Sequence, residues 1–174
     1  MSNEPGAKSS PDKVDGVIAL WAREIPELDT RAMELFGRIH RVSDQVRARM
    51  RGIHAEFGLR QGEFDVLATL RRSGEPYRLS PTDLARSMLL TTGGMTQRLD
   101  RLESAGWVTR VARPRDKRGV DAQLTPAGRE LVDRAVRRGV AEELLIVDLL
   151  GADACRDLSD RLRDLLAQVD RSFS

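Results

Sequence analysis

Apolar side chains recur at steps of three and four through most of the chain, which is typical of amphipathic helices. The first such stripe covers residues 14–25. A longer one covers residues 29–57, with Asp29 as its predicted N-cap and Gly58 as its predicted stop. A third predicted helix covers residues 61–72. The front part of the chain is therefore expected to be helical.

A Ser-Pro and a Thr-Pro pair mark helix starts in the second half of the chain. Ser80 is the predicted cap of a short helix with Pro81 at its first position, where proline fits best. Thr125 and Pro126 repeat the pattern and open a long helix that ends near Gly151. A last helix follows, and its leucines lie at a spacing close to a heptad repeat.

The segment between these two starts predicts a helix followed by a β-hairpin. Thr91 is expected to cap a helix that ends near Gly106. Its inward stripe consists of Met95, Leu99 and Leu102. Residues 107–112 and 120–124 then read as two short strands around a charged tip. A helix-turn-helix followed directly by a hairpin is a winged helix.

The predicted fold class is mainly α with a small two-stranded β-wing: a winged helix-turn-helix, dimerised through N- and C-terminal helices. The predicted parts are a disordered tail (1–12), an extra N-terminal helix (13–27), a long helix (28–58), the DNA-binding winged helix-turn-helix domain (59–124) and C-terminal dimerisation helices (125–174). The dimer is expected because a small central domain cannot cover all the apolar stripes, and burying one apolar side chain is worth ~1.5–3 kcal/mol. Packing of these stripes within one chain is the alternative.

Charge is distributed unevenly, although the net charge is only +2. Residues 86–118 carry 8 Arg or Lys against 3 acids, whereas residues 142–170 carry 3 Arg against 8 acids. The hairpin tip itself reads Arg-Pro-Arg-Asp-Lys-Arg-Gly over residues 113–119. Such polarity indicates an anionic partner at one end of the molecule.

The outward face of the helix after Thr91 and the hairpin tip carry the candidate DNA contacts. Gln and Arg can each make paired hydrogen bonds to a purine edge, and the first N–H groups of a helix suit a phosphate. The tip is expected to enter the neighbouring minor groove. The candidates are Thr91, Thr92, Gly94, Thr96, Gln97, Arg98, Arg101, Arg115, Lys117 and Arg118. Asp116 is expected to stabilise the wing by pairing with Arg118. A solvated helix face and turn are the alternative.

The segment DKRGVDAQLTPAG resembles the wing signature of the MarR family of bacterial regulators, with Asp116, Arg118, Leu124 and Thr125 at the matching positions. The match extends upstream through LSPTDLARSMLLTTGGMTQRLDRLESAGWVTR and covers roughly residues 28–170. The resemblance implies a homodimer that binds double-stranded DNA at a pseudo-palindromic operator. It also implies a repressor that is released when a small anion or phenolic compound binds.

The segment VIALWAREIPELD resembles the extra N-terminal helix of the PecS-like, urate-responsive branch of this family. In that branch a pocket between the front helix and the DNA-binding lobe holds the ligand. Carried over by motif, the candidate ligand-binding residues are Trp21, Asp65, Arg72, Arg98 and Arg110. The implied effector is small and anionic or aromatic, with urate or a purine first and a carboxylic acid second. Two plain structural roles remain alternatives: Trp21 as a core anchor and Asp65 with Arg98 as a salt bridge.

An enzyme is not expected from the distribution of reactive side chains. His40 and His54 lie 14 positions apart on one helix, roughly 21 Å at 1.5 Å per residue, and no catalytic or metal-binding spacing surrounds them. His54 is expected to form a surface pair with Glu56. Neither a cofactor nor a metal is expected. The sequence therefore favours a binding protein.

The sequence also bears on redox chemistry, membrane binding and other binding roles. Cys155 is the single cysteine, so a redox-sensing repressor is an alternative, and a reducing cytoplasm is the expected location. No apolar run approaches the ~20 residues that cross a bilayer, so no membrane partner is expected. The remaining alternatives are a ligand-independent architectural DNA-binding protein and an interaction module that uses the acidic C-terminal helix.

Overall fold

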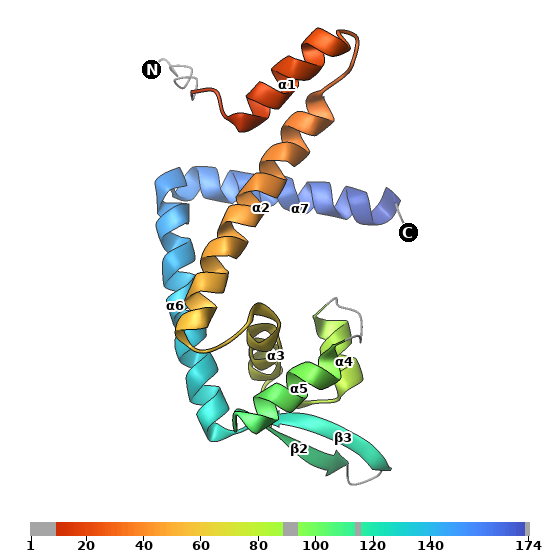
Figure 1. The fold of residues 1–174 in the computed structure, drawn as a ribbon, viewed down its shortest axis with the longest axis vertical. Coiled ribbons are helices and arrows are strands. Elements are labelled where there is room, and N and C mark those ends of the chain that lie inside the picture. The colour runs from red at the N-terminus through yellow and green to blue at the C-terminus, as the bar shows by residue number, and fades with distance from the viewer. Residues whose placement is uncertain (1–9, 89–93, 114–115, 173–174) are drawn as a thin grey trace. The chain divides into compact units, whose positions relative to one another are not determined.

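The computed structural model describes residues 10–88, 94–113 and 116–172, without the side chains of residues 116–118. Two compact units make up the chain, an N-terminal unit (1–49) and a C-terminal unit (50–174), and their boundary lies inside one helix. The elements, labelled in Figure 1, are α1 (Lys13–Glu24), α2 (Arg31–Glu56), α3 (Gln61–Arg72), β1 (Arg78–Leu79), α4 (Pro81–Ser87), α5 (Met95–Ser104), β2 (Val108–Arg113), β3 (Asp116–Leu124), α6 (Pro126–Leu150) and α7 (Ala152–Ser172).

The N-terminal unit is a helical hairpin held by one arginine. Arg38 on α2 donates hydrogen bonds to Asp12 at 2.9 Å and to Asp15 at 2.6 Å. Asp12, which the sequence assigned to the tail, caps α1 in a reciprocal capping box with Asp15. Val14 is buried against Gly37, where a Cβ would lie 3.1 Å from a Val14 methyl group. The two helices can therefore approach closely at Gly37.

The core of the C-terminal unit joins α3, α4, α5, the sheet and the first half of α6. Figure 1 shows α3, α4 and α5 clustered beside the β2–β3 hairpin, with α6 running past them. The buried apolar members are Leu59, Val66, Leu67, Leu70, Leu84, Ala85, Met95, Leu99, Leu102, Val108, Ala122, Leu124, Leu131, Val132 and Ala135. The predicted inward stripe of α5 is confirmed, because all three of its residues are in this core.

The sheet has three strands rather than the two that the sequence predicted. β1 pairs with β3 in antiparallel register, Arg78 opposite Gln123 and Leu79 opposite Ala122. β3 also pairs with β2, so the strand order is β1-β3-β2. β1 was missed because it is two residues long and too short to show an alternating pattern. Its effect is to tie the base of the hairpin to the segment that precedes α4.

Two further expectations require correction. The helix predicted to start at Thr91 begins at Met95, and its N-cap is Gly94 at a φ of +83°, where glycine is favoured. His54 does not form a surface pair with Glu56. Its side chain is 2% exposed and stacks on Phe64 with ring centroids 3.8 Å apart. Its Nδ1 lies 3.1 Å from Gln61 Oε1, so one ring nitrogen keeps a hydrogen-bond partner in the buried position.

The second half of α6 and all of α7 leave apolar side chains exposed. None of the described residues of α7 is buried. Leu149 on α6 is 89% exposed, and Leu145, Leu158 and Leu166 are also exposed. Within the residues that the structure describes, no helix combines the length and apolar character needed to span a membrane.

Candidate nucleic-acid interface

Local caps fix the start of the helix-turn-helix. Ser80 Oγ accepts a hydrogen bond from the Asp83 amide at 3.0 Å and donates one to the Asp83 carboxylate at 2.6 Å. Pro81 occupies the first helical position, as the sequence predicted. α4 then packs Leu84 and Ala85 into the core beneath α5. These contacts set the position of the second helix of the motif.

The exposed face of α5 offers a small set of polar groups for DNA. Gly94, Thr96 and Gln97 are exposed at its first turn. Two other candidates, Thr91 and Thr92, lie outside the described residues. The geometry suits a helix whose N-terminal side chains contact base edges in the major groove.

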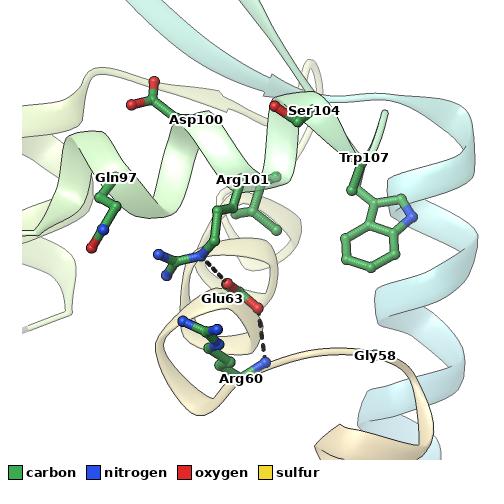
Figure 2. A pocket seen from close by; sticks show the side chains of 10 residues that line it. Gly58, Arg60, Glu63, Gln97, Asp100, Arg101, Ser104 and Trp107 are labelled. Atoms are coloured by element: carbon green, nitrogen blue, oxygen red, sulfur yellow. Dashed lines mark hydrogen bonds and ion pairs between the residues drawn. The ribbon is translucent and has the colours of Figure 1, made fainter.

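Arg101, predicted to contact DNA, lies against α3 instead of pointing freely into solvent. Its Nε donates to Glu63 Oε1 at 2.5 Å, and Glu63 Oε2 accepts from the Arg60 amide at 2.8 Å (Figure 2). Glu63 is 6% exposed. Burial alone would raise the pKa of Glu63, but the hydrogen bonds from the Arg60 amide and the Arg101 guanidinium lower it. The pair locks α5 onto the N-terminal end of α3.

An open hollow of about 620 Å³ lies beside this pair. Figure 2 shows it with the Trp107 indole at one side and Arg101 reaching across to Glu63. Its lining consists of Gly58, Arg60, Glu63, Gln97, Asp100, Arg101, Leu102, Ser104, Ala105 and Trp107. Two arginines and two carboxylates among these residues leave the hollow without net charge. It is therefore a poor site for an anion.

Arg98 was predicted both as a DNA contact and as a ligand contact, and it is half-buried against α3. A Cβ on Gly62 would lie 2.6 Å from Arg98 Nε, so the glycine leaves the space in which the guanidinium rests. Arg98 Nη1 is buried and has no hydrogen-bond partner among the described residues. A buried cationic donor without an acceptor is costly, and an anion would satisfy it.

The other predicted ligand contacts do not converge in the C-terminal unit. Asp65 accepts from Gln61 Nε2 at 2.9 Å, and among the described residues no ion pair joins it to Arg98. Arg72 donates to the Ser87 carbonyl at 3.0 Å. Arg110 forms ion pairs with Asp100, at 2.5 Å, and with Glu103. Trp21 belongs to α1 in the N-terminal unit, and its side chain is 39% exposed.

The wing is described up to its tip. Arg115 lies outside the described residues, as do the side chains of Asp116, Lys117 and Arg118. Behind the tip, Asp121 on β3 accepts from Arg113 Nε at 2.6 Å and lies 3.6 Å from Arg78 Nε. Sequence reasoning missed both Asp121 and Glu63. The position of Glu63 in the first turn of α3 was a usable signal, whereas nothing local marked Asp121.

Among the described residues no cluster of His, Cys, Asp or Glu could hold a metal ion. The helix-turn-helix, the three-stranded sheet and the polar first turn of α5 define a winged-helix DNA-binding protein. The MarR family model matches residues 57–119. The chain is 35% identical to the HTH-type transcriptional regulator PecS of Dickeya dadantii (strain 3937) over 159 residues. The alignment covers 91% of this chain and 93% of PecS. The chain belongs to the MarR family of transcriptional regulators, which bind DNA and are not enzymes.

Solved structures agree with this assignment. A mutant MarR from E. coli complexed with operator DNA matches 84% of this chain and 98% of its own, at 27% identity and a TM-score of 0.67. NadR in complex with 4-hydroxyphenylacetate matches 83% of this chain and 97% of its own, at 26% identity and a TM-score of 0.62. The arrangement of helices and wing is thus that of the family.

Proposed function

We propose that this regulator acts as a homodimer on a pseudo-palindromic operator and represses transcription until a small anionic or aromatic effector releases it. α5 of each protomer enters a major groove, with the two grooves ~34 Å apart, and the wings reach the flanking minor grooves. The MarR complex with operator DNA supports an operator as the binding partner. The exposed first turn of α5, with Thr96 and Gln97, is the surface that reads the bases.

The proposed dimer rests on apolar surface that one chain leaves uncovered. Leu145, Leu149 and Leu150 on α6 are exposed, and so are Leu158 and Leu162 on α7. Exposed apolar patches of this kind mark interaction surfaces, and a two-fold axis would bury them on both chains at once. A dimer also accounts for a palindromic operator, because each protomer binds one half-site.

The proposed effector response rests on one observation: Nη1 of Arg98 is buried and has no hydrogen-bond partner within the part of the chain that the structure describes. Arg98 belongs to α5, so an anion that binds this guanidinium acts directly on the helix that reads DNA. A ligand shifts an equilibrium only when it binds two states differently, so an anion on Arg98 would have to favour a position of α5 other than the DNA-bound one. The bound 4-hydroxyphenylacetate of NadR, a phenol whose ring carries a carboxymethyl group, supports this chemical class. Urate is the first effector to test because of the similarity to PecS.

The experiment is a titration of tryptophan fluorescence with urate, 4-hydroxyphenylacetate and benzoate, with operator binding followed in parallel. Wild type is compared with Trp21→Phe and with Arg98→Gln, and Trp107 stays as an internal control. Saturable quenching, with release of DNA at the same concentrations, is expected in wild type and is expected to be lost in Arg98→Gln. Loss of quenching in Trp21→Phe would show that the effector binds close to Trp21.

Absence of any response, with operator binding intact, would leave a ligand-independent architectural DNA-binding protein. Redox sensing is tested separately with Cys155→Ser. If peroxide lowers operator binding in Cys155→Ser as much as in wild type, Cys155 is not the redox sensor.

A further inference from the structure

Asp121 lies at the centre of an ion-pair cluster that links all three strands of the sheet. It is on β3, the middle strand, and its side chain is 14% exposed. One carboxylate oxygen accepts from Arg113 Nε on β2 at 2.6 Å. The other lies 3.6 Å from Arg78 Nε on β1. A single carboxylate therefore faces one arginine from each outer strand.

Both arginines lie close to the wing: Arg113 is next to its tip in the sequence, and Arg78 is on the strand that pairs with β3. Arg113 is the last residue of β2 before the tip, at the point where the register with β3 shifts. It has a further partner in addition to Asp121. Arg78 pairs across the sheet with Gln123, two positions along β3 from Asp121. Loss of the carboxylate would leave Arg78 without this ion pair and add one positive charge to the base of the wing.

An added cation near a DNA-binding hairpin lowers the sequence specificity of DNA binding. Contacts to phosphate carry no sequence information, and they supply almost all of the affinity for non-specific DNA. Specificity is the ratio of operator to non-specific affinity, so a cation that strengthens non-specific binding more than operator binding lowers this ratio. A carboxylate that offsets one of the two positive charges on the sheet arginines keeps the affinity for non-specific DNA low.

We propose that Asp121 is a specificity-determining residue: its carboxylate pairs with Arg78 and Arg113 and offsets one of their two positive charges, which weakens their binding to the DNA backbone, and it holds the three strands that carry the wing. This inference rests on the proposed contact between the wing and DNA. It assigns to Asp121 a different task from that of the tip residues, because Asp121 weakens non-specific binding and the tip strengthens operator binding.

The test uses Asp121→Asn, which keeps the shape of the side chain and removes its charge. Two duplexes of equal length serve as probes, one selected by the wild-type protein from a random-sequence library and one with a scrambled sequence. Affinity for the scrambled duplex is expected to rise several-fold. Its dependence on salt is expected to steepen by about 0.9 in the slope of log K against log salt, the value for one phosphate contact on B-DNA. The ratio of the two affinities falls.

Two further variants separate charge from structure. Asp133→Asn is the matched control, because Asp133 on α6 forms a similar pair with Arg71 on α3 at 2.7 Å and lies outside the sheet. It is expected to leave both affinities unchanged. Arg78→Gln in the Asp121→Asn background removes the added charge and is expected to restore the wild-type slope.

A fall in operator affinity with no change for the scrambled duplex would overturn the proposal, since Asp121 would then act on the wing fold alone. An unchanged slope in Asp121→Asn, or no restoration by Arg78→Gln, would overturn it as well. Failure of the proposed function is a different result. In that case Arg118→Ala at the tip would leave operator affinity at its wild-type value.

Discussion

The first turn of α6 lies directly against the carbonyl oxygen of Trp107. A Cβ added to Gly128 would be 2.0 Å from that oxygen, far inside van der Waals contact. Thr125 fixes the same junction, because its amide donates to the Trp107 carbonyl at 3.1 Å and its Oγ1 donates to the Gly106 carbonyl at 2.8 Å. Helix α6 can therefore join the base of the wing only if residue 128 has no side chain.

Gly128→Ala is expected to lower the free energy of unfolding by about 1–3 kcal/mol or more, because backbone has to move to relieve the overlap. Urea unfolding followed by circular dichroism measures the change at fixed protein concentration. Gly52→Ala on α2 is the matched control, since a Cβ there meets nothing within 4 Å apart from its chain neighbours and the backbone of its own helix. It is expected to be neutral or to stabilise by up to about 1 kcal/mol through helix propensity. Equal effects of the two substitutions would contradict this account of Gly128.

Gly62→Ala tests the space occupied by Arg98. The Cβ would lie 2.6 Å from Arg98 Nε, but this neighbour is the end of a flexible side chain, so the guanidinium can shift. We expect a small change in unfolding free energy and a weaker effector response, because the guanidinium would leave its buried position. Unfolding and effector titration on the same preparation separate the two effects. A normal response in Gly62→Ala would show that the position of Arg98 does not matter.

The Glu63–Arg101 pair is expected to stabilise the packing of α5 on α3. Glu63→Gln keeps an acceptor for the Arg60 amide and removes the charge, and hydrogen bonds to charged groups are worth about 1.5–3 kcal/mol. A double-mutant cycle with Arg101→Gln measures the coupling. A coupling free energy near zero would mean that Arg101 can leave Glu63 and contact DNA without a loss of folding stability.

Buried His54 predicts a loss of stability in mild acid. Burial lowers the pKa of His54 below the ordinary value of 6.5, despite opposing effects of Gln61, Asp65 and Glu143. The unfolded chain then binds the proton more readily than the folded chain. The contribution of His54 is therefore complete above about pH 6.5 and is lost as the pH falls through the lower folded-state pKa.

Unfolding free energy measured between pH 5 and 7.5 checks this expectation. The slope in this range is expected to be smaller in His54→Gln and unchanged in His40→Gln, since His40 is exposed on α2. If both variants keep the wild-type slope, another group causes the pH dependence.

Gln97→Ala is expected to relax base preference more than it lowers non-specific binding. Gln97 is exposed on the first turn of α5, and its amide can form two hydrogen bonds to an adenine edge, worth about 1–3 kcal/mol of discrimination. Selection from a random-sequence library, repeated with the variant, shows which operator position loses its preference. An equal loss for all sequences would assign Gln97 to the phosphate backbone.

Short-range signals in the sequence were reliable because they depend on neighbouring residues only. Ser80 and Thr125 cap helices through amides three positions ahead, and each is followed by a proline at the first helical position. The stripe of Met95, Leu99 and Leu102 follows from helical periodicity. Such features are visible in a window of a few residues.

Contacts between distant segments were missed for the opposite reason. β1 is a strand only because β3, more than forty residues later, pairs with it. His54 looks like a polar surface residue until Phe64 from the next helix stacks on it. Arg101 reads as a free cation on an outward face, but Glu63 from α3 binds it.

The sequence by itself determined the order of the helices, the caps that start them, the polar first turn of α5 and the cationic tip of the hairpin, because periodicity, capping and charge are local properties of the chain. Only the tertiary structure decided which arginines are available. Arg98 and Arg101 on α5 and Arg110 on β2 look alike in sequence. Yet Nη1 of Arg98 is buried without an acceptor among the described residues, whereas Arg101 and Arg110 are paired with carboxylates. Packing made that distinction, because it sets which acceptor lies within hydrogen-bonding distance of each guanidinium.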